Sequence, residues 1–305
     1  MWLTSQILEK DFFANRDIPI PNICDSTLLL LQIQYILMSY FANKVVVVTG
    51  GSEGIGRALV ELLLQKGARV ATCSRHYEKM YELQTSHPGQ ALHIATADVS
   101  KEMDCQNFIR SAIKTFGTID ILINNAGVSM RALFKDLDLE TIHTLMDVNF
   151  WGTVYCTKFA LDEIIKNKGT VVGVSSIAGF RGLPGRTGYS ASKFAVNGFL
   201  EALRTELMED GVNVMWVCPG FTTSNIRNVA LDKDAKPQKE NPMDEDKMMS
   251  AEECAVYILE AIEKKKRTRI LTFLGKRTVF MNRFFPGLAD KLVRKFYFKE
   301  GELVK

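Results

Sequence analysis

Tyr189 and Lys193 have the residue types and the spacing that most directly suggest chemistry. They are four positions apart in a stretch with helical periodicity, so their side chains share one helix face. A free tyrosine has a pKa near ~10, and a neighbouring ammonium lowers it by stabilising the phenolate. Such a tyrosine can donate a proton to a carbonyl oxygen or accept one from an alcohol. Ser176, at the end of an apolar run, can hydrogen-bond the same oxygen. Taken alone, a Tyr–Lys pair at this spacing is more often part of an exposed helix surface. The other motifs of the chain therefore decide whether the pair is catalytic.

The glycine-rich segment 49–56 is a candidate nucleotide site. It connects the β-branched run 45–48, a predicted buried strand, to the amphipathic stretch 55–66, a predicted helix. Glycines here allow a tight turn and close approach of the backbone to a pyrophosphate, and the helix N-terminus supplies N–H groups for phosphates. The GxxxGxG spacing differs from the usual GxGxxG, so a purely structural turn is the alternative. The residues expected to bind the nucleotide are Gly50, Ser52, Gly54, Ile55 and Gly56.

The end of the second predicted strand, 69–74, indicates which nucleotide binds. An NAD site commonly has an acidic residue there for the ribose 2′-hydroxyl, whereas an arginine accommodates a 2′-phosphate. Arg75 follows this strand, so the sequence favours NADP(H), although Glu53 puts negative charge near the same pocket. A solvated surface arginine is the alternative. Asp98, after the third strand, either accepts from the adenine amine or caps the next helix with Ser100.

Short apolar runs alternate with amphipathic stretches from residue 44 onward, and hydrophobic residues make up 47% of the chain, enough for a large core. Because each crossover between parallel strands needs a helix, this alternation predicts an α/β fold. We expect a Rossmann-type doubly wound parallel sheet in one domain, with a polar loop or lid at 231–249. The seven predicted strands are 45–48, 69–74, 91–97, 120–123, 171–175, 212–218 and 270–273.

The ordered set of motifs resembles the short-chain dehydrogenase/reductase family over about residues 41–273. The glycine motif is followed by Asp98-Val99, the segment 124–127 (Asn-Asn-Ala-Gly), Asn149, Ser176, Tyr189-x-x-x-Lys193 and Pro219-Gly220. Joint occurrence in this order is far more specific than any one motif.

The resemblance implies roles for individual residues. Ser176 would position the substrate, Tyr189 would transfer the proton, and Lys193 would bind the nicotinamide ribose and tune Tyr189. Asn149 would hold a water that relays protons past Lys193. It also implies a homodimer or homotetramer. The residues implied to line the cofactor are Asn125, Ala126, Gly127, Pro219, Gly220 and Thr222.

Both ends of the chain differ from the segment between them. Residues 1–40 are an extension, either an anchoring segment or the product of an upstream start codon. The segment 264–305 holds thirteen Lys or Arg and three Asp or Glu, against a net charge of +3 for the whole chain. Its tail, 275–305, interleaves these charges with Phe and Leu, so it either binds a membrane surface or packs on the domain 41–274. We expect a cytoplasmic protein, peripheral at the membrane if the tail binds lipid.

The sequence supports one function above its alternatives. We expect an NADP(H)-dependent oxidoreductase that reduces an apolar carbonyl compound, with general similarity to membrane-associated keto-lipid and steroid-type reductases. An inert NADP(H)-binding regulator and an NAD-dependent alcohol dehydrogenase are the alternatives. Six cysteines form no CxxC pair, and the near-neutral charge suggests no nucleic acid, so we expect neither a metal site nor a nucleic-acid partner. Residues expected to shape the substrate pocket are Met130, Arg131, Leu133 and the segments 180–186 and 221–249.

Overall fold

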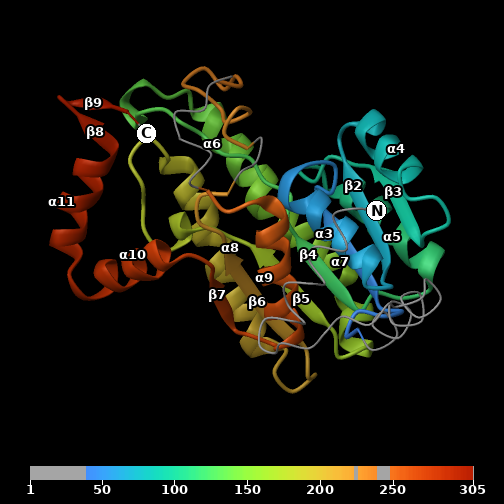
Figure 1. Ribbon diagram of the computed structural model, residues 1–305. Helices are drawn as coiled ribbons and strands as arrows, with labels where there is room; N and C mark the ends of the chain where they lie inside the picture. The colour runs from blue at the N-terminus through green and yellow to red at the C-terminus, as the bar shows by residue number, and fades with distance from the viewer. Residues whose placement is uncertain (1–38, 223–225, 239–247, 305) are drawn as a thin grey trace, which may run out of the picture. The chain divides into compact units, whose positions relative to one another are not determined.

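A seven-stranded parallel sheet forms the centre of the fold (Figure 1). The computed structural model describes residues 39–222, 226–238 and 248–304. The strand order β3-β2-β1-β4-β5-β6-β7 reverses direction between β1 and β4, the point where ligands bind in sheets of this kind. The predicted Rossmann-type doubly wound fold is confirmed. Its strands are β1 (Val45–Thr49), β2 (Arg69–Ser74), β3 (Leu92–Thr96), β4 (Ile121–Asn124), β5 (Thr170–Val174), β6 (Asn213–Cys218) and β7 (Thr268–Ile270).

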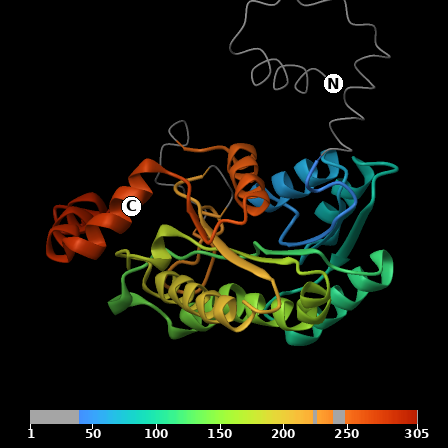
Figure 2. The same cartoon turned by 90° about the horizontal axis from the view of Figure 1, so that it is seen from below.

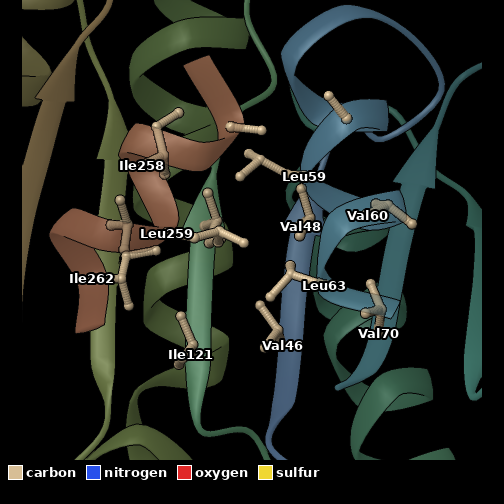
Figure 3. Close-up of a cluster of buried hydrophobic side chains, with 14 of the residues drawn as sticks. Val46, Val48, Leu59, Val60, Leu63, Val70, Ile121, Ile258, Leu259 and Ile262 are labelled. Carbon is tan, nitrogen blue, oxygen red and sulfur yellow. The ribbon is translucent and has the colours of Figure 1, made fainter. Parts of the chain in front are cut away.

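Helices cover both faces of the sheet, which explains the uninterrupted apolar runs of the strands (Figure 2). Val46 and Val48 point into one buried cluster, whereas Val47 points into the other. The first cluster, shown in Figure 3, includes side chains of α3 (Gly54–Gln65), α4 (Tyr77–Thr85) and α9 (Ala251–Glu263). The second includes side chains of α5 (Glu102–Phe116), α7 (Gly152–Lys166) and α8 (Thr187–Glu206). The carboxyl edge of the sheet is therefore held between two packed layers.

Two local predictions differ from the structure. The seventh strand was expected at 270–273, but it ends at Ile270, and Phe273 begins helix α10 (Phe273–Phe284). Thr272 caps that helix, since its side chain accepts a hydrogen bond from the Gly275 N–H. The sequence also predicts a helix through Asn149 to about Lys166, and the observed helical segment begins at Leu139. It comprises α6 (Leu139–Leu145), a π-helical turn η2 (Met146–Trp151) that holds Asn149, and α7.

Two helices and a hairpin follow the sheet. Helix α10 is joined to α11 (Pro286–Tyr297), and β8 (Phe298–Lys299) pairs antiparallel with β9 (Glu302–Leu303). Both views show α10 and α11 beside the end of the domain that carries β7, away from α4 (Figures 1 and 2). The two helices thus extend the domain at the β7 end of the sheet.

Some predicted segments fall outside the described residues. These are nearly all of the extension 1–40 and the middle of the predicted loop 231–249, whose described ends form bridges with neighbouring segments. Within the described ranges, no helix combines the length and apolarity needed to cross a bilayer.

Candidate active site

Ser176 and Tyr189 lie at the carboxyl edge of the sheet. Ser176 follows β5 and caps the short helix η3 (Ile177–Gly179), with its hydroxyl 3.2 Å from the Ala178 nitrogen. Tyr189 is in the first turn of α8 and is buried. Burial raises the pKa of Tyr189, and hydrogen bonding by Ser176 and the positive charge of Arg186 oppose that rise. The sequence predicted that a neighbouring ammonium lowers the pKa of Tyr189, but in this structure burial raises it. Tyr189 therefore keeps its proton at neutral pH.

Lys193 lies one turn further along α8 and is also buried. Its Nζ donates to the Val174 carbonyl at 2.9 Å and lies 5.8 Å from the centre of the Tyr189 ring. Burial lowers the pKa of Lys193 to about 8. The side chain is thus a cation at neutral pH that loses its proton at mildly alkaline pH.

Asn149 connects the loop after β4 to helix α8. Its Oδ1 accepts from the Val128 N–H at 2.8 Å. Its Nδ2 donates to the Val128 carbonyl at 3.0 Å and to the Ser192 hydroxyl at 2.9 Å. The buried side chain therefore holds the backbone after Gly127 against α8, next to Lys193. Its predicted part in a proton relay stays a prediction.

The glycine turn packs so closely that a side chain at Gly50 or Gly56 would collide with neighbouring backbone atoms. Gly50 has φ +72°, and an added Cβ there would lie 3.0 Å from the Ala126 Cα. A Cβ on Gly56 would lie 2.1 Å from the Gly50 carbonyl oxygen. Asn125 holds this turn, because its side-chain amide donates to the carbonyls of Thr49 at 2.9 Å and Gly50 at 3.2 Å. The backbone at the start of α3 is thereby open to a ligand, as a bound pyrophosphate requires.

The charged residues around this turn answer two questions that the sequence left open. Glu53, whose charge counted against a 2′-phosphate, forms an ion pair with Lys79 of α4. Arg75 is exposed at the end of β2. Asp98 does cap the following turn, since its Oδ1 accepts from both the N–H and the hydroxyl of Ser100 at 3.1 and 2.8 Å. Its side chain also faces the nucleotide end of the cavity.

One cavity of about 660 Å³ joins the glycine turn to Ser176, Tyr189 and Lys193. All but one of the predicted site residues line it, and the exception is Asn149, which lies behind the wall. The predicted residues on the cavity surface are Gly50, Ser52, Gly54, Ile55, Gly56, Arg75, Asp98, Asn125, Ala126, Gly127, Ser176, Tyr189, Lys193, Pro219, Gly220 and Thr222.

Some residues expected to shape the substrate pocket lie elsewhere. Met130 is fully buried behind the wall in a cluster with Tyr189, and Arg131 donates to the Leu303 carbonyl at 3.2 Å. Neither they nor Leu133 and Phe180 are on the cavity surface. From the predicted segments 180–186 and 221–249, the cavity takes Leu183, Arg186, Phe221, Ile226, Arg227 and Val229 together with Thr222.

The wall opposite the nucleotide turn comes from α10 and α11, which were not expected at the site. Their contribution is mostly apolar, and in α11 it follows helical spacing, which the alternation of apolar and basic residues in the sequence could have indicated. The residues of the two helices on the cavity surface are Leu274, Gly275, Arg277, Thr278, Met281, Ala289, Leu292, Val293, Phe296 and Tyr297.

Polar contacts fix these helices to the loop that precedes α8. Arg181 donates to Asn282 of α10 at 2.8 Å and forms an ion pair with Asp290 of α11. Asn282 in turn donates to the Phe180 carbonyl at 3.0 Å. Part of the tail therefore packs on the domain, and its inner face is a wall of the cavity.

The assembled site agrees with one family of enzymes. The short chain dehydrogenase family model matches residues 44–235, which is more than half of the chain. This protein is a short-chain dehydrogenase/reductase. Short-chain dehydrogenases/reductases are oxidoreductases that act on alcohol and carbonyl groups, and this chain shares that general activity.

Curated relatives include steroid-type family members. The chain is 30% identical to dehydrogenase/reductase SDR family member 7B from Mus musculus over 263 residues, covering 84% of this chain and 81% of the relative. It is 37% identical to 11-beta-hydroxysteroid dehydrogenase-like 6 from Arabidopsis thaliana, covering 72% and 67% of the two chains.

Solved structures share the fold. A short-chain dehydrogenase/reductase from Burkholderia phymatum in complex with NAD superposes with a TM-score of 0.73 at 22% identity, covering 82% of this chain and 96% of that one. An alcohol dehydrogenase from Thermococcus sibiricus complexed with 5-hydroxy-NADP gives a TM-score of 0.64 at 24% identity, covering 75% and 94%. Both NAD and NADP derivatives thus occur among its structural neighbours.

Proposed function

We propose that this protein is an NADP(H)-dependent reductase of apolar carbonyl compounds. The observation that carries the proposal is the shared cavity, in which Ser176, Tyr189 and Lys193 lie between the glycine turn and the apolar wall of α10 and α11. An intact Ser–Tyr–Lys set beside a nucleotide site favours turnover over the alternative of an inert nucleotide-binding regulator.

Reduction of a carbonyl needs a hydride and a proton. A bound reduced nicotinamide supplies the hydride. Tyr189 supplies the proton, because its raised pKa keeps the phenol protonated at neutral pH. The Ser176 hydroxyl orients the carbonyl oxygen beside that phenol, and the Lys193 ammonium stabilises the phenolate left after transfer. Lys193 would also bind the ribose of the nicotinamide. Asn149 positions the backbone next to Lys193 and holds the water through which Tyr189 regains its proton.

The charges at the adenosine end favour NADP(H) over NAD(H). Arg75 is exposed at the end of β2, where an NAD site commonly has a carboxylate. Lys79 adds a second positive charge and offsets Glu53. A 2′-phosphate would meet two cations there, and a guanidinium binds phosphate oxygens in a bidentate manner.

The substrate wall favours an apolar compound. Leu183, Phe221, Leu292 and Phe296 line that part of the cavity, and the Phe221 and Phe296 rings stack with centroids 6.4 Å apart. The names of the curated relatives include steroid dehydrogenases, which fits an apolar carbonyl substrate such as a steroid or a 3-keto lipid.

The outer face of α10 and α11 is proposed to contact a membrane surface. Phe280, Phe284, Phe285 and Leu288 are exposed there, in a segment rich in lysine and arginine. The protein should co-sediment with anionic vesicles at low salt, and salt should weaken binding. Replacing the three exposed phenylalanines with serine tests the contact without removing the cavity wall. Equal sedimentation of the triple variant and the parent would contradict it.

An oligomer is proposed from a second exposed aromatic group. Trp151 and Tyr155 stack at the start of α7, and Phe194 is exposed on the neighbouring α8. Family members commonly form dimers or tetramers, and an apolar surface on these helices fits a self-complementary contact. Light scattering of the parent and of Phe194→Asp gives the test, with a smaller mass expected for the variant.

The enzymatic proposal is tested by following NADPH oxidation against a panel of long-chain ketones, 3-keto lipids and steroid ketones. Tyr189→Phe should lower kcat by about 10²- to 10⁴-fold while leaving the NADPH Kd nearly unchanged, because only the proton donor is lost. Equal turnover by Tyr189→Phe would contradict the mechanism. Tighter binding of NADH than of NADPH by the parent would favour the NAD-dependent alternative, and Arg75→Asp should reduce NADPH affinity selectively.

A further inference from the structure

The two ends of the cavity differ in the balance of their charged side chains. The nucleotide end carries both signs, since Arg75 and Lys79 lie there with carboxylates, whereas the described residues of the substrate wall carry only cations. Among the described residues on the cavity surface, the carboxylates are Glu53 and Asp98, and both lie at the nucleotide end. Apart from Lys193, the charged side chains on the substrate wall are Arg186, Arg227 and Arg277. A cavity whose substrate end is apolar and positively charged suits a ligand with an apolar body and a negative group.

Arg186 is the cation closest in sequence to the reacting groups. It is the residue just before α8, three positions before Tyr189 and seven before Lys193, so the three side chains follow one helix face. That face is the one directed at the cavity, because all three residues line it.

The guanidinium of Arg186 is tethered at one point. Its Nη1 donates to the Ser129 hydroxyl at 3.1 Å. Its Nε is buried and has no hydrogen-bond partner in the part of the chain that the structure describes. Within the same residues, no carboxylate lies within the 4.0 Å that defines an ion pair with it. Most of its five N–H donors thus remain available.

A guanidinium in this position destabilises the folded protein unless it binds an anion or forms further hydrogen bonds. A partly buried cation loses solvation and regains it only through an anion or through several hydrogen bonds. Its planar fork of donors matches the oxygens of a carboxylate or a phosphate. Ser129 orients this fork without neutralising its charge, which leaves the charge to a ligand.

Tyr297 of α11 provides a second polar group near Arg186. It is buried and lines the same cavity. Burial raises the pKa of Tyr297, and the positive charge of Arg186 opposes that rise, as expected for two groups that are close together. A neutral phenol beside a guanidinium can donate a further hydrogen bond to an anion.

We propose that Arg186, assisted by Tyr297, binds an anionic oxygen group of the substrate, so that the substrate is an apolar oxo compound bearing a carboxylate or a phosphate. This inference rests on the proposed function and narrows its substrate class. The carbonyl lies at Ser176 and Tyr189, the apolar body contacts α10 and α11, and the anion lies at the N-terminal end of α8. Arg227, which donates twice to the Thr222 carbonyl at 2.9 Å, adds positive charge to the same end.

The structure also allows a different role for Arg186. Its charge acts on Tyr189, so it could serve only to tune the proton donor. The two roles give different results with matched substrates. Tuning affects every carbonyl substrate and shifts the pH profile, whereas anion binding affects only substrates that carry the charge.

The experiment compares a long-chain oxo-carboxylic acid, its methyl ester and the corresponding oxo-alkyl phosphate in NADPH oxidation. We expect the parent to use one of the anions with a kcat/KM at least about 10-fold above that of the ester, a difference typical of a charged hydrogen bond. Arg186→Gln should remove this preference by raising the KM of the anion much more than that of the ester. Tyr297→Phe should have a smaller effect in the same direction, and Arg110→Gln, an exposed arginine on α5, should have none.

Binding of dodecanoate and dodecanol, measured by calorimetry in the presence of NADP⁺, gives a readout that does not need turnover. Tighter binding of dodecanoate by the parent, lost in Arg186→Gln, supports the inference. Equal binding of the two probes, or an equal loss of activity on acid, phosphate and ester in Arg186→Gln, overturns it. Reduction of neutral ketones with no preference for anions would leave the proposed function standing and remove only this inference. Absence of turnover with every carbonyl would instead remove the proposed function.

Discussion

The cavity has two walls that are built in different ways. The nucleotide wall consists of backbone turns at the carboxyl ends of the strands, where glycines and the Asn125 amide hold main-chain atoms in place. The substrate wall consists of side chains from two helices that follow the sheet and from the loops before α8 and after β6. Backbone geometry tolerates few substitutions, whereas a wall of side chains can change its shape and charge one residue at a time.

The comparison separates two kinds of specificity. In the proposed function, the nucleotide is recognised through the backbone turn between β1 and α3. In the proposed function, the substrate is recognised through side chains of α10 and α11 and through Arg186. Changes to the first wall should therefore affect binding of the nucleotide, and changes to the second should affect only the choice of substrate.

Gly56→Ala should have the largest effect. Its Cβ would lie 2.1 Å from the Gly50 carbonyl oxygen and 2.5 Å from the Asn125 amide nitrogen, so the turn must move. We expect the NADPH Kd to rise by about 10²-fold, which corresponds to about 3 kcal/mol of strain. Fluorescence titration with NADPH measures the change. Gly198→Ala, in α8, is the matched control because its Cβ would meet nothing within 4 Å. An unchanged Kd in Gly56→Ala would mean that this turn is not the nucleotide wall.

Lys193→Met should stabilise the protein without nucleotide while abolishing activity. Burial lowers the pKa of Lys193 from 10.5 to about 8, so at neutral pH the folded state holds a cation that the unfolded chain solvates better. At about 1.4 kcal/mol for each pH unit, less about 1 kcal/mol for the hydrogen bond lost at Val174, the gain is about 2.5 kcal/mol.

The pH dependence of this gain follows from the direction of the shift. Below pH 8, Lys193 is charged in both states and the full cost applies. Between pH 8 and 10.5 the folded state loses the proton first, so the parent gains stability and the difference from Lys193→Met shrinks. Urea unfolding at pH 7 and pH 10 measures both values. Lys158→Met, an exposed lysine on α7, should show no such difference. A stability difference between Lys193→Met and the parent that widens from pH 7 to pH 10 would contradict the lowered pKa of Lys193.

Phe296→Ala should have the smallest of these effects and should act on one wall only. The Phe296 ring lines the cavity and stacks on Phe221, so its removal takes apolar contact from the substrate. We expect the KM for an apolar ketone to rise by about 3- to 10-fold, or about 1 kcal/mol, with the NADPH Kd unchanged. Phe284→Ala is the control, because Phe284 is 58% exposed and does not line the cavity. Equal effects of the two variants would show that the helices act on the substrate only through general stability.

The sequence predicted the elements around the glycine turn because they are made of local patterns. A β-branched run, a glycine turn and an amphipathic helix are adjacent in the chain, and the confirmed strand order brings Gly50, Asn125 and Tyr189 to one edge. The substrate wall could not be predicted in the same way. Whether the apolar face of 286–297 covers lipid or protein depends on contacts such as Arg181 with Asn282 and Asp290, whose partners are about a hundred residues apart.

The sequence also did not predict how deeply Tyr189 and Lys193 are buried. The spacing of Tyr189 and Lys193 suggested a tyrosine with a lowered pKa, yet both side chains are buried, and desolvation dominates. Arg186 was expected as part of the segment 180–186 that shapes the pocket, and the structure places it on the cavity, but nothing in the sequence indicated that its guanidinium would contact Ser129. Met130 and Arg131 were predicted on the surface of the substrate pocket, but they lie behind its wall. The loop after β4 turns away from the cavity before it reaches them.

The position of the substrate wall along the chain has a consequence for biosynthesis. The ribosome releases the residues of β1 to β6, and with them the glycine turn, Ser176, Tyr189 and Lys193, before it releases α10 and α11. The residues proposed to bind the dinucleotide thus leave the ribosome before the helices that complete the cavity. A chain that ended after β7 would contain the glycine turn, Ser176, Tyr189 and Lys193 but would lack the apolar wall that α10 and α11 provide.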